Sequence, residues 1–186
     1  MDRIVPLLRS AAWVAIIVAF NPPLSAQGPR SADRSPADLA DVESVDAIIS
    51  AVYDVISGPA GQERDWDRMR SLFIPGARLI PTFRDSTGAW QHRVMSVDEW
   101  ITNADPVLVR NGFFERELHR VAERYGNIVH LFSTYDSKRS PEVKPFARGI
   151  NSFQLLYDDS RWWVVTIFWQ GESPDHPIPA EYLPTR

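Results

Sequence analysis

The sequence contains no cysteine among its 186 residues, which excludes disulfide bonds, thiolate metal sites and a cysteine nucleophile. Histidine is scarce as well, and no two of the four histidines have the spacing of metal ligands within one predicted element. The motifs GxGxxG, GxxxxGK[ST], GxSxG and HExxH are all missing. We therefore expect no metal and no cofactor.

An excess of positive charge is also lacking. Lys and Arg number 20 against 24 Asp and Glu, giving a net charge of −4. A nucleic-acid-binding protein needs a broad basic surface to neutralise phosphates, and this composition does not provide one. We expect no nucleic acid among the partners.

The chain has no apolar run of the roughly 20 residues that span a bilayer. Its longest apolar run is Ala11 to Phe20, which follows Arg3 and Arg9 and precedes Leu24-Ser25-Ala26. This order is typical of a secretory signal peptide over residues 1–26. It predicts a periplasmic or secreted protein with no stable membrane span after cleavage. An uncleaved anchor is the alternative.

The remaining chain divides into three parts. Residues 27–35 are polar without apolar periodicity and are predicted to be a flexible linker. Residues 36–171 contain the periodic segments of one α+β domain. Residues 172–186 hold four prolines, which forbid a long helix, so we expect this tail to lie along the domain surface.

Apolar residues at three- and four-residue steps predict a first helix over 36–57. A second helix is predicted after Asp65, ending at Pro75-Gly76. Ser96 and Glu99 form a capping box before a third helix, which Asp105-Pro106 is expected to interrupt.

Six strands are predicted, over 77–84, 90–95, 113–125, 128–138, 147–157 and 162–170. Two hairpins, one of which turns at Gly126-Asn127, favour a largely antiparallel sheet. Apolar residues occupy both faces of the last strand, with Trp162, Val164 and Phe168 on one side and Ile167 and Trp169 on the other. The second apolar face predicts a homodimer through the outer sheet face, or else a cover formed by the tail.

The order helix, helix, strand, strand, helix and four strands resembles the nuclear-transport-factor-2-like superfamily over residues 36–170. SnoaL-like polyketide cyclases, ketosteroid isomerases and scytalone dehydratase belong to it. The local similarities are Asp65-Trp66-Asp67, the segments 72–77 and 146–153, and Arg161-Trp162-Trp163-Val164-Val165. The resemblance implies a cone-shaped roll, in which a strongly curved six-stranded sheet, mixed or antiparallel, wraps around three helices. It also implies that dimers are common.

The resemblance identifies two positions in relation to ketosteroid isomerases. Those enzymes use a helix tyrosine as hydrogen-bond donor, and Tyr53 fits that position. They use a strand aspartate as base, and Pro81, which cannot accept a proton, stands in its place here. Scytalone dehydratase relies on a His–Asp pair with tyrosines, a set that we do not match in this chain.

Polar or aromatic residues within apolar segments provide further candidates for a ligand site. Tyr135 and Asn151 interrupt apolar strands and could orient a ligand, or bond neighbouring backbone. Trp66 and Trp169 could line the mouth of a pocket, or pack in the core. If Gly126-Asn127 is a two-residue turn, Glu123 lies opposite His130. The pair could act in acid–base chemistry or form a solvated ion pair.

These observations predict an exported protein that binds a small, largely apolar molecule through Tyr53, Trp66, His130, Tyr135, Asn151 and Trp169. One alternative is a cofactor-free lyase, isomerase or cyclase acting on a small hydrophobic substrate, which would require a buried titratable group with a displaced pKa. The second alternative is a dimeric protein-interaction module.

Overall fold

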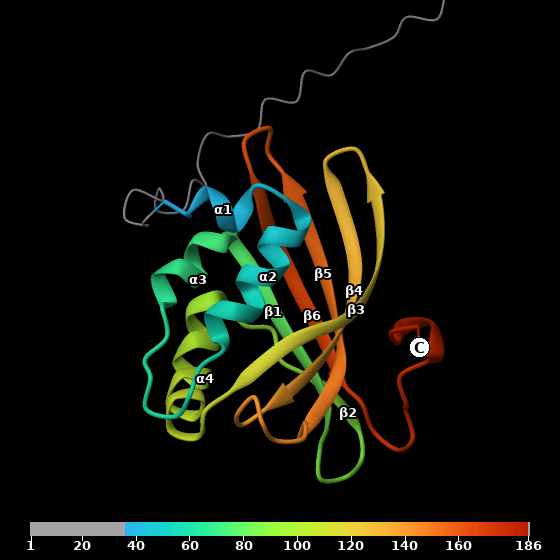
Figure 1. Ribbon diagram of the computed structural model, residues 1–186. Helices are drawn as coiled ribbons and strands as arrows, with labels where there is room; N and C mark the ends of the chain where they lie inside the picture. The colour runs from blue at the N-terminus through green and yellow to red at the C-terminus, as the bar shows by residue number, and fades with distance from the viewer. Residues whose placement is uncertain (1–35, 186) are drawn as a thin grey trace, which may run out of the picture. The chain divides into compact units, whose positions relative to one another are not determined.

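A curved six-stranded sheet wraps around the helices on its concave side, as Figure 1 shows. The computed structural model describes residues 36–185. The predictions for residues 1–26 and 27–35 therefore lie outside the described residues. The mixed α+β cone predicted from the sequence is confirmed for the domain.

The sheet has the strand order β2-β1-β6-β5-β4-β3. Its strands are β1 (Phe73–Arg84), β2 (Trp90–His92), β3 (Phe114–Tyr125), β4 (Ile128–Lys138), β5 (Ala147–Tyr157) and β6 (Trp162–Gly171). Neighbouring strands are antiparallel except for β1 and β6, which pair in parallel. The parallel pair joins the N-terminal hairpin to the C-terminal meander, and so places the long strands in one continuous sheet.

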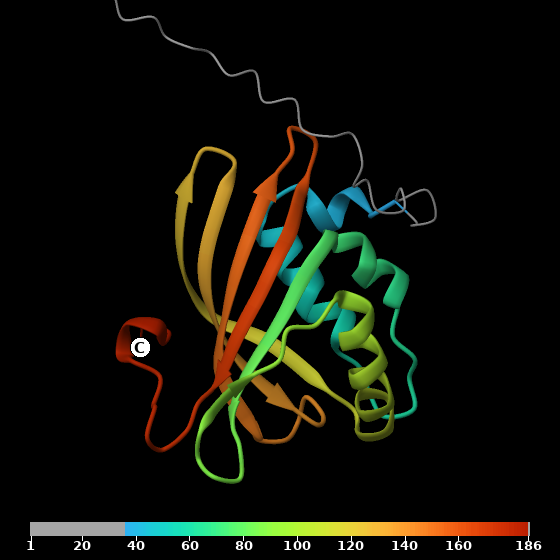
Figure 2. The same cartoon turned by 180° about the vertical axis from the view of Figure 1, so that it is seen from behind.

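Four helices pack on the concave side (Figure 2): α1 (Leu39–Val42), α2 (Val45–Ile56), α3 (Trp66–Leu72) and α4 (Val97–Asn111). The first predicted helix is two helices, because the Ser44 hydroxyl accepts a hydrogen bond from the Ala47 amide and starts α2 afresh. The second ends at Leu72, earlier than predicted. No helix among residues 36–185 is long and apolar enough to cross a bilayer.

The expected interruption of α4 at Pro106 is wrong, because the helix continues through the proline. Pro106 lacks an N–H and so leaves only one intrahelical hydrogen bond unmade. The capping box of Ser96 and Glu99 is present as predicted, and it fixes the start of the helix.

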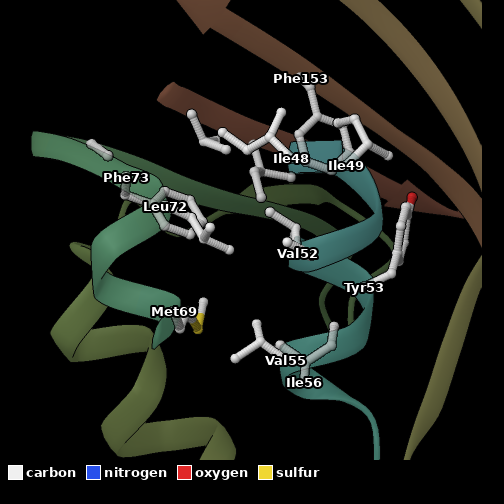
Figure 3. Close-up of a cluster of buried hydrophobic side chains, with 14 of the residues drawn as sticks. Ile48, Ile49, Val52, Tyr53, Val55, Ile56, Met69, Leu72, Phe73 and Phe153 are labelled. Carbon is white, nitrogen blue, oxygen red and sulfur yellow. The ribbon is translucent and has the colours of Figure 1, made fainter. Parts of the chain in front are cut away.

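The core lies between α2, α3 and the concave face of the sheet. Ile48 and Ile49 of α2, Leu72 of α3 and Phe153 of β5 are all fully buried, and Figure 3 shows them converging. Tyr53 projects from the same helix toward the strands, so a phenol hydroxyl reaches the sheet from an otherwise apolar helix face.

A β-bulge changes which residues of β6 face inward. Leu155 pairs with Val164 and Gln154 with Thr166, which leaves Val165 as an extra residue. The buried residues Trp162, Val164 and Ile167 therefore share the inner face. The sequence prediction, which assumed strict alternation along the strand, had placed Ile167 on the opposite face. Phe168 points outward and remains 46% exposed.

The C-terminal tail covers part of the outer sheet face. Its short 3-10 helix η1 (Ala180–Tyr182) lies against β4, where the Thr134 hydroxyl donates to the Tyr182 carbonyl at 2.6 Å. The rings of Phe132 and Tyr182 are 5.5 Å apart. The tail is thus one cover for this face, and the predicted homodimer stays a prediction.

Candidate functional site

A cavity of about 150 Å³ lies between α2, α4 and the concave face of the sheet. Most of its wall is apolar and includes Val52, Met69, Leu79, Trp100, Leu108 and Trp169. Four polar residues complete the wall: Tyr53, Glu115, Tyr135 and Asn151. An engineered apolar cavity of about the same volume stays dry and binds benzene, so this space suits a molecule with one small ring.

A directional chain of hydrogen bonds connects the polar residues. The Glu117 carboxylate accepts from the Ser133 hydroxyl at 2.5 Å. Because Ser133 has only one hydroxyl hydrogen, its oxygen must accept the 2.7 Å bond from the Tyr53 hydroxyl. The Asn151 amide donates to the Tyr53 oxygen at 3.1 Å. The hydroxyl hydrogen of Tyr53 is therefore already engaged in a hydrogen bond to Ser133.

Arg120 anchors the outer end of this chain. Its guanidinium bonds both oxygens of Glu117 and also pairs with Asp46 of α2 at 2.7 Å. A carboxylate held by a guanidinium is an acceptor, which fixes the direction of the hydrogen bond from Ser133. Burial, the largest cause, together with the charge of Glu115, raises the pKa of Tyr53 well above its ordinary value, so Tyr53 is a neutral phenol.

Glu115 is the titratable acid of the cavity. Its carboxylate accepts from the Ser137 hydroxyl at 2.7 Å and faces the Asn151 amide at 3.5 Å. Although the residue as a whole retains partial exposure, the protein packed around its side chain raises the pKa to about 7, and the charge of Asp136 adds to this effect. Glu115 can therefore both accept and release a proton near neutral pH.

The Tyr135 hydroxyl has no hydrogen-bond partner among residues 36–185, although the residue is only 7% exposed and lines the cavity. Burial, followed by the charge of Glu115, raises the pKa of Tyr135, so this group is also a neutral phenol. Tyr135 lies beside Gly149 of β5 in the ladder. A β-carbon at Gly149 would lie 2.5 Å from the hydroxyl, so glycine makes room for the ring.

A bulge at Leu118 turns both glutamates of β3 inward. Glu117 pairs with Tyr135 and His119 with Thr134, leaving Leu118 as the extra residue. Before the bulge the odd-numbered residues face α2, and after it Arg120 takes the inner side. Between the bulge and the turn at Gly126-Asn127, β3 and β4 pair in the register that the sequence predicted, with Glu123 opposite His130.

Four of the six predicted ligand-binding residues lie on the cavity wall: Tyr53, Tyr135, Asn151 and Trp169. Their role in ligand binding stays a prediction. The other two lie outside this wall. Trp66 donates its indole N–H to Asp105 at 2.9 Å and packs edge-on against Trp100.

His130 lies opposite Glu123, as the predicted turn requires, but on the outer face of the sheet. Its imidazole is 3.2 Å from the Ser152 hydroxyl and packs against the ring of Phe132. These residues therefore belong to the surface beneath the tail. Among residues 36–185 no group of three or more histidine or acidic side chains is arranged to hold a metal ion.

Sequence reasoning missed Glu115, Glu117, Ser133 and Ser137 as parts of one site. The glutamates occur in a strand rich in charge, which is typical of a solvated face. Their inward direction depends on the bulge, and no residue signals a bulge at Leu118. The serines of β4 were the available signal, because two hydroxyls within a buried strand need partners.

A larger hollow, about 560 Å³, opens between α2 and β3 on the other side of Tyr53 and Glu115. Both side chains line the hollow and the cavity, so they form the partition between them. Asp54, Glu117 and Lys138 also line the hollow, so charged groups border a surface that is otherwise largely apolar. The polar end of the cavity thus lies next to a surface groove that carries charged groups.

Comparison with solved structures identifies the fold. A protein of unknown function with a cystatin-like fold from Nostoc punctiforme aligns with a TM-score of 0.54 and 8% identity, over 75% of this chain and 97% of that one. An NTF-2-like protein of unknown function from Silicibacter pomeroyi aligns with a TM-score of 0.50 and 14% identity, over 70% and 94%. No family model matches the sequence, and no curated protein matches it. The domain has the nuclear-transport-factor-2-like cone fold.

Proposed function

We propose that this protein binds a small, largely apolar molecule inside the cone, with one polar group of the ligand directed toward Glu115, Tyr135 and Asn151. The observation that supports the proposal is the apolar cavity of about 150 Å³ with polar groups in its wall. Binding sites for small molecules typically combine apolar walls with a few placed polar groups. Export to the periplasm or beyond is part of the same proposal.

Benzene is a suitable first probe because its size matches the space. We expect saturable shifts of the backbone amide signals of cavity-lining residues when benzene is added to ¹⁵N-labelled protein. Leu108→Phe, which puts a larger side chain into the cavity wall, should abolish these shifts. Val107→Phe is the matched control because Val107 lies next to it on α4 and is 40% exposed. A wild-type protein without saturable shifts would refute the proposal.

A second candidate function is cofactor-free proton transfer, and the position of Glu115 favours it. A buried carboxyl with a pKa of about 7 can take a proton from the α-carbon of a small ketone and later return a proton to that carbon. In this step the C–H bond breaks, the proton moves to the Glu115 carboxylate, and the electron pair moves to the carbonyl oxygen. In the return step the carbonyl double bond re-forms from the oxygen electron pair, and the electron pair of the enolate C=C takes the proton from the carboxyl to make the new C–H bond.

The exchange of the α-hydrogens of cyclohexanone in D₂O tests this second function. NMR should detect faster exchange with the wild-type protein, with a rate that rises as pH passes through about 7 because the ionised carboxylate is the base. Glu115→Gln should lose the acceleration. Glu123→Gln, an exposed glutamate of the same strand, should retain it. Equal rates for wild type and Glu115→Gln would exclude the acid–base role.

A further inference from the structure

The two tyrosines of the cavity differ in how their hydroxyl hydrogens are used. Tyr53 donates to Ser133, because the hydrogen of Ser133 is committed to Glu117. Its oxygen already accepts from the Asn151 amide. Tyr53 is thus engaged both as donor and as acceptor without any ligand.

Tyr135 is in the opposite situation. Its hydroxyl has no hydrogen-bond partner among the described residues, and the residue as a whole is only 7% exposed. Among the described residues no fully enclosed side-chain oxygen or nitrogen lacks a partner, so the Tyr135 hydroxyl is accessible from the cavity, where a ligand or a water molecule can accept its hydrogen. The hydroxyl of Tyr135 lies close to the place a β-carbon of Gly149 would occupy, so the strand pairing holds the ring in position.

The cavity limits what can satisfy this donor. About 150 Å³ suits a single ring, and the apolar residues that form most of the wall favour a ligand with little polarity elsewhere. We propose that the ligand is a monocyclic compound with one hydrogen-bond-accepting oxygen, of the cyclic ketone class, and that Tyr135 rather than Tyr53 donates the hydrogen bond to that oxygen. This inference rests on the proposed function and specifies the ligand class and the donor.

Three six-membered rings of similar shape test the chemistry. Cyclohexanone only accepts hydrogen bonds, cyclohexanol both donates and accepts, and methylenecyclohexane does neither. Since a net hydrogen bond contributes about 0.5–1.5 kcal/mol, cyclohexanone should bind roughly two- to thirteenfold more tightly than methylenecyclohexane. Dissociation constants from NMR titration of the full chain provide the ratio.

Two variants assign the donor. Tyr135→Phe should reduce the affinity ratio of cyclohexanone to methylenecyclohexane to about one, because it removes the donor and keeps the ring. Tyr53→Phe should leave the ratio unchanged, even if it weakens the fold by breaking the chain to Ser133. The ratio is the measured quantity because a change in stability or cavity shape affects both probes alike.

The wild-type protein provides a measurement that needs no stable variant. With ¹³Cζ-labelled tyrosine, cyclohexanone should shift the signal of Tyr135 and leave that of Tyr53 in place. Three results would overturn the inference and still leave binding in the cavity intact. The first is an affinity ratio of cyclohexanone to methylenecyclohexane near one in the wild type, and the second is binding of cyclohexanol without binding of cyclohexanone. The third is an affinity ratio that changes in Tyr53→Phe. If none of the three rings and no benzene binds, the proposed function fails and this inference fails with it.

Discussion

Replacement of Glu115 by glutamine should make the protein more resistant to unfolding above neutral pH. The ordinary pKa of this carboxyl is 4.5, and the fold raises it to about 7, mainly by desolvation. At about 1.4 kcal/mol per pH unit, this interval corresponds to roughly 3 kcal/mol. Glutamine keeps the size of the side chain, removes its charge and, like the protonated carboxyl, offers one accepting oxygen and one donating group.

The sign follows from proton binding. Between pH 4.5 and about 7 the folded chain holds a proton on Glu115 that the unfolded chain has released, so the stability due to this group is full below pH 4.5 and falls as pH rises through 7. The free energy of unfolding of Glu115→Gln minus that of wild type should therefore rise by roughly 3 kcal/mol between pH 4.5 and 7.5 and then level off. The charges facing Glu115, chiefly Asp136, remain in both proteins.

Urea unfolding at a series of pH values, followed by tryptophan fluorescence, measures this difference. Glu123→Gln provides the matched control for loss of one negative charge from the same strand at an exposed site. A difference curve for Glu115→Gln that is flat, or that falls with pH, would refute the reasoning. The same result would remove the basis for acid–base chemistry in the cavity.

Three further substitutions test the packing of the site. Gly149→Ala should destabilise the fold by about 1–3 kcal/mol because its β-carbon would overlap a backbone carbonyl and the Tyr135 hydroxyl. Gly171→Ala is the control, because its β-carbon would meet nothing closer than 3.9 Å, and it should unfold at nearly the wild-type temperature. Ser133→Ala should cost about 1–3 kcal/mol in urea unfolding because it leaves buried partners unpaired, and an unchanged midpoint would contradict the hydrogen-bond chain. Leu131→Ala should cost about 2–5 kcal/mol, while Ile128→Ala on the same strand, 53% exposed, should cost far less; equal losses would show that burial does not distinguish them.

The sequence was sufficient to predict the order of the main helices and all six strands, because local signals specify them, although the first predicted helix is two helices. The capping box at Ser96 and the two-residue turn at Gly126-Asn127 depend on short-range chemistry, and both are present. The register next to that turn was also predicted, including Glu123 opposite His130. The cone itself came from the resemblance to a known superfamily.

The site was harder to predict because its geometry depends on bulges and on contacts distant in sequence. Tyr53 and Asn151 were named as candidates, yet the bond that joins them spans 98 positions in the chain. Strict alternation along β3 would place Glu115 on the same face as Glu123 and His130, and a single extra residue in β3 puts Glu115 on the opposite face. Alternation of side chains is a reliable guide only between bulges.

The extra residue at Leu118 has a consequence for how the interior side chains of proteins with this fold change in evolution. Removing this one position would restore strict alternation along β3, so that either the Glu115 half or the Arg120 half of the strand would have to swap sides. Related chains that differ by one residue at this edge could thus gain or lose an interior acid while their cores stay the same. Variation in the length of a strand, rather than substitution within it, would then decide whether a cone of this shape holds a proton acceptor.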